Sequence, residues 1–164
     1  MVTKSQYVLL AMLALGATAI AGAPPASVTS IHQEVDFYSS PIAAANAAIL
    51  YDALLDEKQV GAFGGAPARI DRTPGGSFKI FGGRITGRNI ELIPDRRIVQ
   101  AWRLETWPAG VYSIVRFELT ETDSGVHLVL EQTGFPPEDR EALTANWPKK
   151  YWEPMRKLLY LTLP

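Results

Sequence analysis

Three consecutive segments near the middle of the chain alternate apolar and polar residues, and this pattern constrains the fold more than any other feature. The segments span residues 97–104, 111–120 and 126–133, and the ETDSG sequence between the last two favours a hairpin turn. Antiparallel strands joined by short turns bury one face of their sheet, so another element must cover that face. The sequence therefore predicts an antiparallel meander with one apolar face.

The segment that begins at residue 137 is long enough to supply this cover as a helix. Its apolar residues recur at spacings of three and four and form one stripe. The stripe contains Leu143, Trp147, Tyr151, Met155, Leu158 and Leu159. Pro148 and Pro154 interrupt the segment, and they predict a bend or a helix in two pieces.

The first half of the chain predicts one strand, two short helices and three weaker strands. Alternation from Ile31 indicates a half-buried first strand. Ser40 and Pro41 predict the start of a first helix, and Asp56 with Gln59 predicts a capping box for a second one. The weaker strands are expected over residues 68–71, 76–82 and 87–93.

Composition limits the classes of function. The chain has 164 residues, 47% of them hydrophobic, with a net charge of −1, which fits one domain and no nucleic-acid partner. Cysteine is absent, which excludes disulfides and thiolate metal sites. With only His32 and His127, a zinc site of three histidines is excluded as well.

The amino terminus predicts export. Lys4 precedes an apolar run of about 13 residues and then small residues, which is the layout of a secretory signal peptide. We expect a signal peptide over residues 1–21 with cleavage near Ala21, a flexible leader over 22–29, and one domain over 30–164. The protein is then periplasmic or secreted, without stable membrane insertion; it is membrane-anchored if the segment is retained.

The stretch GGRITGRN, residues 82–89, superficially resembles a phosphate-binding loop. Such a loop follows a buried parallel strand and opens a helix, whereas this stretch leads directly into the apolar segment IELI. We expect instead that Gly82, Gly83 and Gly87 permit a bulge or a sharp bend and shape the wall of a cavity.

Several segments together resemble the homologues of the activator of heat-shock-protein-90 ATPase. They are GGSFKIFGGRITGRNIELIPDRRIVQAWR, VYSIVRFELT, GVHLVLEQTGFP and NWPKKYWEPMRKLL, and the resemblance covers roughly residues 30–161. That family belongs to the START-like, helix-grip superfamily. The resemblance implies an α+β fold in which a curved antiparallel sheet of about seven strands wraps around a long C-terminal helix, with two short helices after the first strand. It also implies that the first strand pairs with the last, and that a cavity lies between sheet and helix.

The resemblance and the alternation together predict a set of cavity residues. Two glutamines and the Tyr151 hydroxyl would orient a ligand among apolar walls. The candidates are Gln100, Trp102, Val115, Phe117, Leu130, Gln132, Trp147, Tyr151 and Met155. Periodicity alone favours a plain packed core.

The leading hypothesis is binding of a small apolar or amphipathic molecule, lipid or polyketide-like, with no catalysis, cofactor or metal. One alternative is a cyclase or dehydratase that uses the same pocket, and another is an interaction protein like the chaperone-ATPase activator; any protein partner is unknown. Glu91 is a candidate for a catalytic carboxylate. Alternation, however, places it with Asn89 on the outward face, opposite Ile90 and Leu92.

Two surface clusters carry minor hypotheses. His32 and His127 are expected on adjacent strands of the convex face, which Glu34, Asp36 and Glu131 share. A copper or zinc site is conceivable there, but two histidines on a charged surface are more often only that. The arginines at positions 84, 88, 96 and 97 suit an anionic partner, but solvated strand ends and turns explain them better.

Overall fold

The computed structural model describes residues 28–161. The predicted signal peptide and most of the predicted leader lie outside the described residues. Thr29, near the end of that leader, accepts a hydrogen bond at its carbonyl from the Gly134 N–H (2.9 Å). No helix within residues 28–161 is both long enough and apolar enough to cross a membrane.

The described chain forms one seven-stranded antiparallel sheet whose strand order is β1-β7-β6-β5-β4-β3-β2. The predicted pairing of the first strand with the last is therefore confirmed. The strands are β1 (Ser30–Tyr38), β2 (Arg69–Ile70), β3 (Ser77–Ile80), β4 (Ile85–Ile93), β5 (Arg97–Leu104), β6 (Ser113–Thr122) and β7 (Gly125–Thr133).

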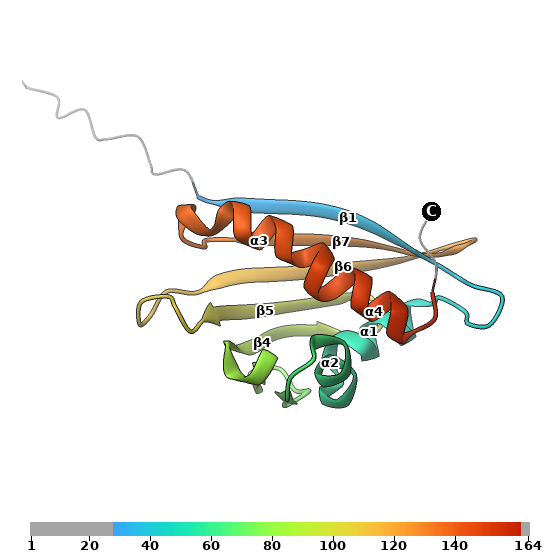
Figure 1. Cartoon of the computed structure of the whole chain (residues 1–164), viewed down its shortest axis with the longest axis horizontal. Coiled ribbons are helices and arrows are strands. Elements are labelled where there is room, and N and C mark those ends of the chain that lie inside the picture. Colours follow the sequence, from blue (N-terminus) through green and yellow to red (C-terminus); the bar gives the residue numbers. More distant parts are fainter. Residues whose placement is uncertain (1–27, 162–164) are drawn as a thin grey trace, which may run out of the picture.

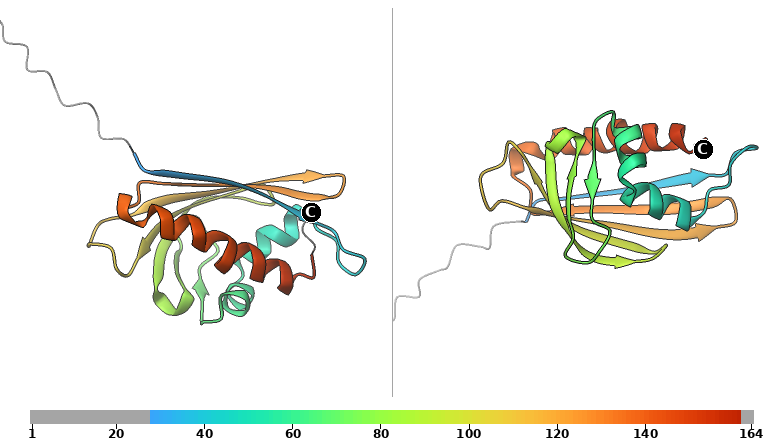
Figure 2. Two further views of the ribbon diagram at one scale, coloured as in Figure 1. Left: turned by 45° about the horizontal axis from the view of Figure 1, so that its top comes forward. Right: turned by 90° about the horizontal axis from the view of Figure 1, so that it is seen from below.

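All of the helices lie on one face of this sheet, as the views in Figures 1 and 2 agree. The helical segment over residues 140–158, called the C-terminal cover below, runs diagonally across β1, β7 and β6. Two short helices cover the side near β3 and β4. The α-helices are α1 (Ala47–Leu55), α2 (Glu57–Gly64), α3 (Arg140–Trp147) and α4 (Glu153–Leu158); the shorter turns are η1 (Phe81–Gly83), η2 (Pro137–Asp139) and η3 (Pro148–Trp152). The α+β helix-grip prediction is confirmed.

The C-terminal cover is interrupted where its prolines predict. Pro148 begins η3, a π-helical segment between α3 and α4, and Pro154 occupies the first turn of α4. Proline lacks an N–H, so the first turn of a helical segment tolerates it best. The prediction of a helix in pieces is confirmed, and the pieces are joined by this π-helical turn.

The two short helices show one correct and one incorrect prediction. The Asp56 side chain accepts hydrogen bonds from the N–H groups of Lys58 and Gln59, as a capping residue of α2 should. Ser40, however, does not start α1. Its hydroxyl accepts from the Ala43 N–H and closes a local turn, and Asn46 caps the helix six residues later.

One hydrophobic core fills the space between the sheet and the helices. Inward-facing side chains of β1, β5, β6 and β7 meet α1 and the C-terminal cover in this core. Members that are at most 1% exposed include Phe37, Leu50, Ile98, Phe117, Leu128, Leu130 and Met155. The alternation of β5, β6 and β7 therefore predicted the buried face correctly.

A β-bulge in β4 changes the expected alternation there. The register between β4 and β5 shifts between Asn89 and Glu91, so two residues of β4 oppose one residue of β5. As a result Asn89 is buried and Ile90 is 50% exposed, the reverse of the prediction. Glu91 points outward as predicted: its side chain is 45% exposed and forms an ion pair with Arg97 at 3.3 Å.

Candidate ligand-binding cleft

A half-open cleft of about 590 Å³ lies at one end of the core. Four parts of the chain enclose it: the end of α2, the η1 turn with the start of β4, the end of β5, and the junction of α3 with η3. Its lining includes Gly64, Ala66, Phe81, Gly82, Arg84, Ile85, Trp102, Leu104, Glu105, Thr106, Leu143, Asn146, Trp147, Lys150 and Tyr151. This volume falls within the range of small-molecule sites.

Four aromatic rings in mutual contact form one wall of the cleft. Trp147 lies 4.8 Å from Tyr151 and 5.1 Å from Trp102, between ring centroids, and Phe81 lies 5.5 Å from Tyr151. The rings are tilted or edge-on to one another, as aromatic pairs prefer. The wall continues into the core, where Trp152 stacks on Trp147 at 5.4 Å.

The two inward glutamines hold the indole rings of this wall in place. Trp102 donates its indole N–H to Gln100 Oε1 (2.8 Å), and Trp147 donates to Gln132 Oε1 (3.0 Å). Both glutamines are at most 5% exposed, so an unpaired amide or indole there would be costly. Their amides therefore fix the cleft wall.

Two further buried side chains complete these hydrogen-bond chains. Gln100 Nε2 donates to Asn89 Oδ1 (2.8 Å), and Asn89 Nδ2 donates to the Asp71 carbonyl (2.7 Å). Gln132 Nε2 donates to the Ser113 hydroxyl (3.0 Å). Sequence reasoning missed Asn89 because of the bulge in β4, and it missed Ser113 because a lone serine at a strand start carries no distinctive signal.

Tyr151 contributes a polar group to an otherwise apolar wall. Burial raises the pKa of its hydroxyl well above the usual value of 10.0, so the group is neutral at physiological pH. Within residues 28–161 this hydroxyl has no hydrogen-bond partner, so it is free to donate to or accept from a ligand.

The rim of the cleft is charged. Arg84, Glu105 and Lys150 stand around it, and none of the three forms an ion pair with another residue of the described chain. The Glu105 N–H donates to the Arg84 carbonyl (2.9 Å) and ties the end of β5 to the start of β4. An apolar interior with a charged rim suits an amphipathic molecule.

The glycine-rich stretch over residues 82–89 contributes to the wall of the cleft and does not form a phosphate loop. It connects β3 to β4, two antiparallel strands, and Gly82 lines the cleft with a left-handed backbone (φ 69°). Gly87 serves a different purpose, because a Cβ there would lie 2.0 Å from the Ala101 carbonyl oxygen and 2.3 Å from the Phe78 ring. Gly87 lets β4 and β5 approach closely over Phe78.

The structure places the nine predicted cavity residues in two groups. Trp102, Trp147 and Tyr151 line the cleft. The other six are buried in the core behind it: Gln100, Val115, Phe117, Leu130, Gln132 and Met155. Contact of any of the nine with a ligand stays a prediction.

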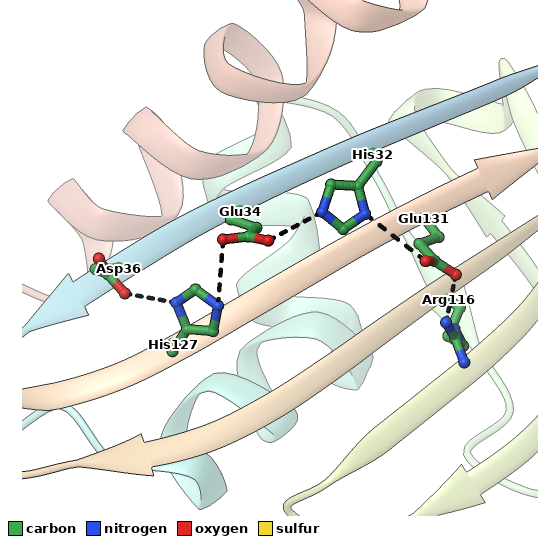
Figure 3. A network of polar contacts seen from close by, with 6 residues as sticks. All are labelled: His32, Glu34, Asp36, Arg116, His127 and Glu131. Carbon is green, nitrogen blue, oxygen red and sulfur yellow. Dashed lines mark hydrogen bonds and ion pairs between the residues drawn. The ribbon is translucent and has the colours of Figure 1, made fainter.

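On the opposite, convex face, His32 and His127 lie on adjacent strands as expected (Figure 3). Glu34 stands between them, 3.0 Å from His32 Nε2 and 3.7 Å from His127 Nε2, and Asp36 lies 2.8 Å from His127 Nδ1. Within residues 28–161 no group of three or more such side chains is arranged to hold a metal ion. The copper or zinc hypothesis therefore has no support in this geometry.

The predicted arginine cluster is dispersed. Arg97 pairs with Glu118 (2.7 Å) on the convex face, Arg88 donates to the Gly75 carbonyl (2.9 Å), and Arg84 stands at the cleft rim. These three arginines therefore have separate surroundings and share no common partner.

The sheet, the C-terminal cover and the cleft between them define the class of protein: this is a domain of the START-like, helix-grip fold. A solved HSP90 activator from Plasmodium falciparum has this fold. It superimposes with a TM-score of 0.74 at 20% identity, and the match covers 82% of this chain and 99% of that one.

The chain belongs to the family of Activator of Hsp90 ATPase homolog 1-like proteins, which matches it over residues 44–160. An uncharacterized protein of Schizosaccharomyces pombe is 31% identical over 144 residues, which cover 86% of this chain and 43% of that protein. The human activator of 90 kDa heat shock protein ATPase homolog 1 is 28% identical over 108 residues, 66% of this chain and 32% of that protein. The chain thus spans less than half the length of these relatives.

Proposed function

We propose that this domain binds a small amphipathic molecule in the cleft, without changing it chemically. The observation that carries the proposal is the wall of four contacting aromatic rings beside about 590 Å³ of half-open volume. The wall offers apolar area to the body of a ligand, and Tyr151 offers a neutral hydroxyl. The charged rim receives the ligand's polar end.

Among residues 28–161 the lining of the cleft holds no buried acid and base pair, which favours binding over the alternative cyclase or dehydratase activity. Glu105 is the one carboxylate among the described lining residues, and it stands exposed at the rim. General acid–base catalysis needs a group whose pKa is tuned by burial or by close partners. The cleft's buried titratable group is Tyr151, and burial raises its pKa and keeps it protonated.

A cleft-filling variant tests the proposal. Thr106 is exposed and lines the cleft, so Thr106→Trp should obstruct the opening without disturbing the core. Thr122→Trp, at the exposed far end of β6, is the matched control. Titration calorimetry with 1-anilinonaphthalene-8-sulfonate, an aromatic amphiphile, should show one site per chain in the wild type and the control. Equal binding by Thr106→Trp, or none by the wild type, would count against the cleft.

A second candidate function is regulation of a chaperone ATPase. It is favoured by family membership and by relatives that are named as activators of the 90 kDa heat-shock-protein ATPase. Adding the purified domain to such a chaperone and measuring ATP hydrolysis tests this candidate. A rise that saturates with domain concentration would support it, and an unchanged rate at saturating domain would refute it.

We also propose that the domain works after export, because residues 1–21 have the layout of a signal peptide. This compartment suits capture of a small molecule better than regulation of a cytosolic chaperone. Mass spectrometry of the protein from a bacterial periplasmic or culture fraction should find a chain that begins at Gly22. A chain that retains residues 1–21 would contradict cleavage.

A further inference from the structure

The outer edge of β1 is unpaired within the described chain. β1 is the first strand in the sheet order and pairs only with β7. The Thr29 carbonyl and the Ser39 N–H form hydrogen bonds with residues that flank β7. The peptide groups of the odd-numbered residues of β1 therefore face β7. By alternation, the peptide groups of His32, Glu34 and Asp36 face the open edge.

The edge is flanked but not covered by the C-terminal helices. Arg140 donates to the Ser30 carbonyl (2.6 Å), and Trp152 donates to Gln33 Oε1 (3.1 Å), which holds the helices beside the strand. A shallow groove of about 360 Å³ remains between Val35 and Trp152. A nine-residue edge with an adjoining groove is a template for strand addition.

We propose that β1 pairs with β1 of a second copy of this chain, antiparallel about a twofold axis at Gln33. This register sets His32 of each copy opposite Glu34 of the other, and Ile31 opposite Val35. Both pairs are complementary, one polar and one apolar. The peptide groups of His32 and Glu34 then exchange hydrogen bonds across the axis, and two seven-stranded sheets become one.

Charge disfavours the registers that are centred on a carboxylate. An axis at Glu34 or at Asp36 would set that carboxylate directly opposite its own copy, and like charges directly opposite one another destabilise a strand pair. An axis at Gln33 creates no like-charged opposite pair. Glu34 remains within reach of His32 of its own strand, at 3.0 Å, so the second copy extends the polar network of Figure 3.

Backbone substitution at Glu34 tests the pairing. Because its N–H faces the open edge, Glu34→Pro removes an intermolecular donor and leaves the β1–β7 bonds intact. Glu34→Ala is the control that loses the same side chain but keeps the N–H. In sedimentation equilibrium of the full chain, the wild type should reach twice the monomer mass with increasing concentration, Glu34→Ala should do so more weakly, and Glu34→Pro should remain monomeric.

Side-chain substitution at His32 provides a test that leaves the backbone alone. His32→Glu sets two carboxylates opposite each other twice per dimer and should weaken association about tenfold, whereas His32→Lys should strengthen it. A wild type that stays monomeric at every concentration would overturn the proposal. So would equal association by Glu34→Pro and Glu34→Ala, or by the two His32 variants.

Discussion

Replacing Gln132 by leucine tests whether this residue belongs to the framework of the domain. Gln132 is fully buried, accepts from the Trp147 indole and donates to the Ser113 hydroxyl. Leucine is close in size to glutamine, so the substitution leaves little cavity but removes both partners. A buried polar group left unpaired costs about 1–3 kcal/mol, so we expect Gln132→Leu to lower the free energy of unfolding by about 2–4 kcal/mol.

The cost should divide between the two lost partners. Ser113→Ala in the Gln132→Leu background removes the orphaned hydroxyl and should recover about 1 kcal/mol, whereas Ser113→Ala alone should be destabilising. Urea unfolding followed by tryptophan fluorescence measures all four proteins of this double-mutant cycle. A free energy of unfolding for Gln132→Leu within about 0.5 kcal/mol of the wild-type value is typical of surface substitutions. That result would refute a buried, fully paired glutamine.

Three other substitutions test separate parts of the fold. Gly87→Ala should cost at least about 2 kcal/mol in urea unfolding, because its Cβ would overlap the Ala101 carbonyl; a neutral effect would contradict the close approach. Asp56→Ala should cost about 1 kcal/mol in thermal unfolding through loss of the α2 cap, and an unchanged melting temperature would refute the capping role. Burial raises the Tyr151 pKa, so folding opposes ionisation of its hydroxyl. The stability that the neutral hydroxyl contributes is therefore complete below the usual tyrosine pKa of 10.0, and it falls as pH rises above that value. Tyr151→Phe should therefore lose less stability than the wild type as pH rises through 10.0, and equal losses in the two proteins would argue against that shift.

Alternation predicted the buried face of the sheet but not the partners of its polar residues. Alternation predicts that Gln100 and Gln132 point inward, and the structure buries both. Their roles depend on which side chains meet them across strands and helices, such as the indole of Trp147. Alternation predicts that Asn89 points outward, which is wrong because a single extra residue in β4 reverses the alternation. The nearby glycines predict a bulge or bend but do not give its position.

Periodicity likewise does not predict the position of the cleft. It lies at one end of the core, where the left-handed turn over residues 81–83 meets the junction of α3 with η3. The glycines indicated a bend, but the direction of the bend decides which inward residues reach open volume. Trp102, Trp147 and Tyr151 do reach it, whereas Val115 and Leu130 lie deeper in the core.

Local hydrogen bonding also decided where the first helix begins. Ser40 followed by Pro41 is typical of a helix start and predicts one six residues before Asn46, the residue that caps α1. In the structure the Ser40 hydroxyl closes a short turn with Ala43, and α1 begins where the Ala47 N–H meets the Glu121 carboxylate on β6. The local cap by Asn46 and the contact with Glu121 therefore both accompany the start of α1, after the turn that Ser40 closes.

Native mass spectrometry of the gently purified protein tests the central claim, the binding of a small amphipathic molecule in the cleft, most directly. The account predicts one non-covalent small molecule per chain in the wild type and in Thr122→Trp, and its loss in Thr106→Trp. Wild-type protein that carries no molecule and takes up no 1-anilinonaphthalene-8-sulfonate would contradict the claim. So would a bound molecule that Thr106→Trp retains in full.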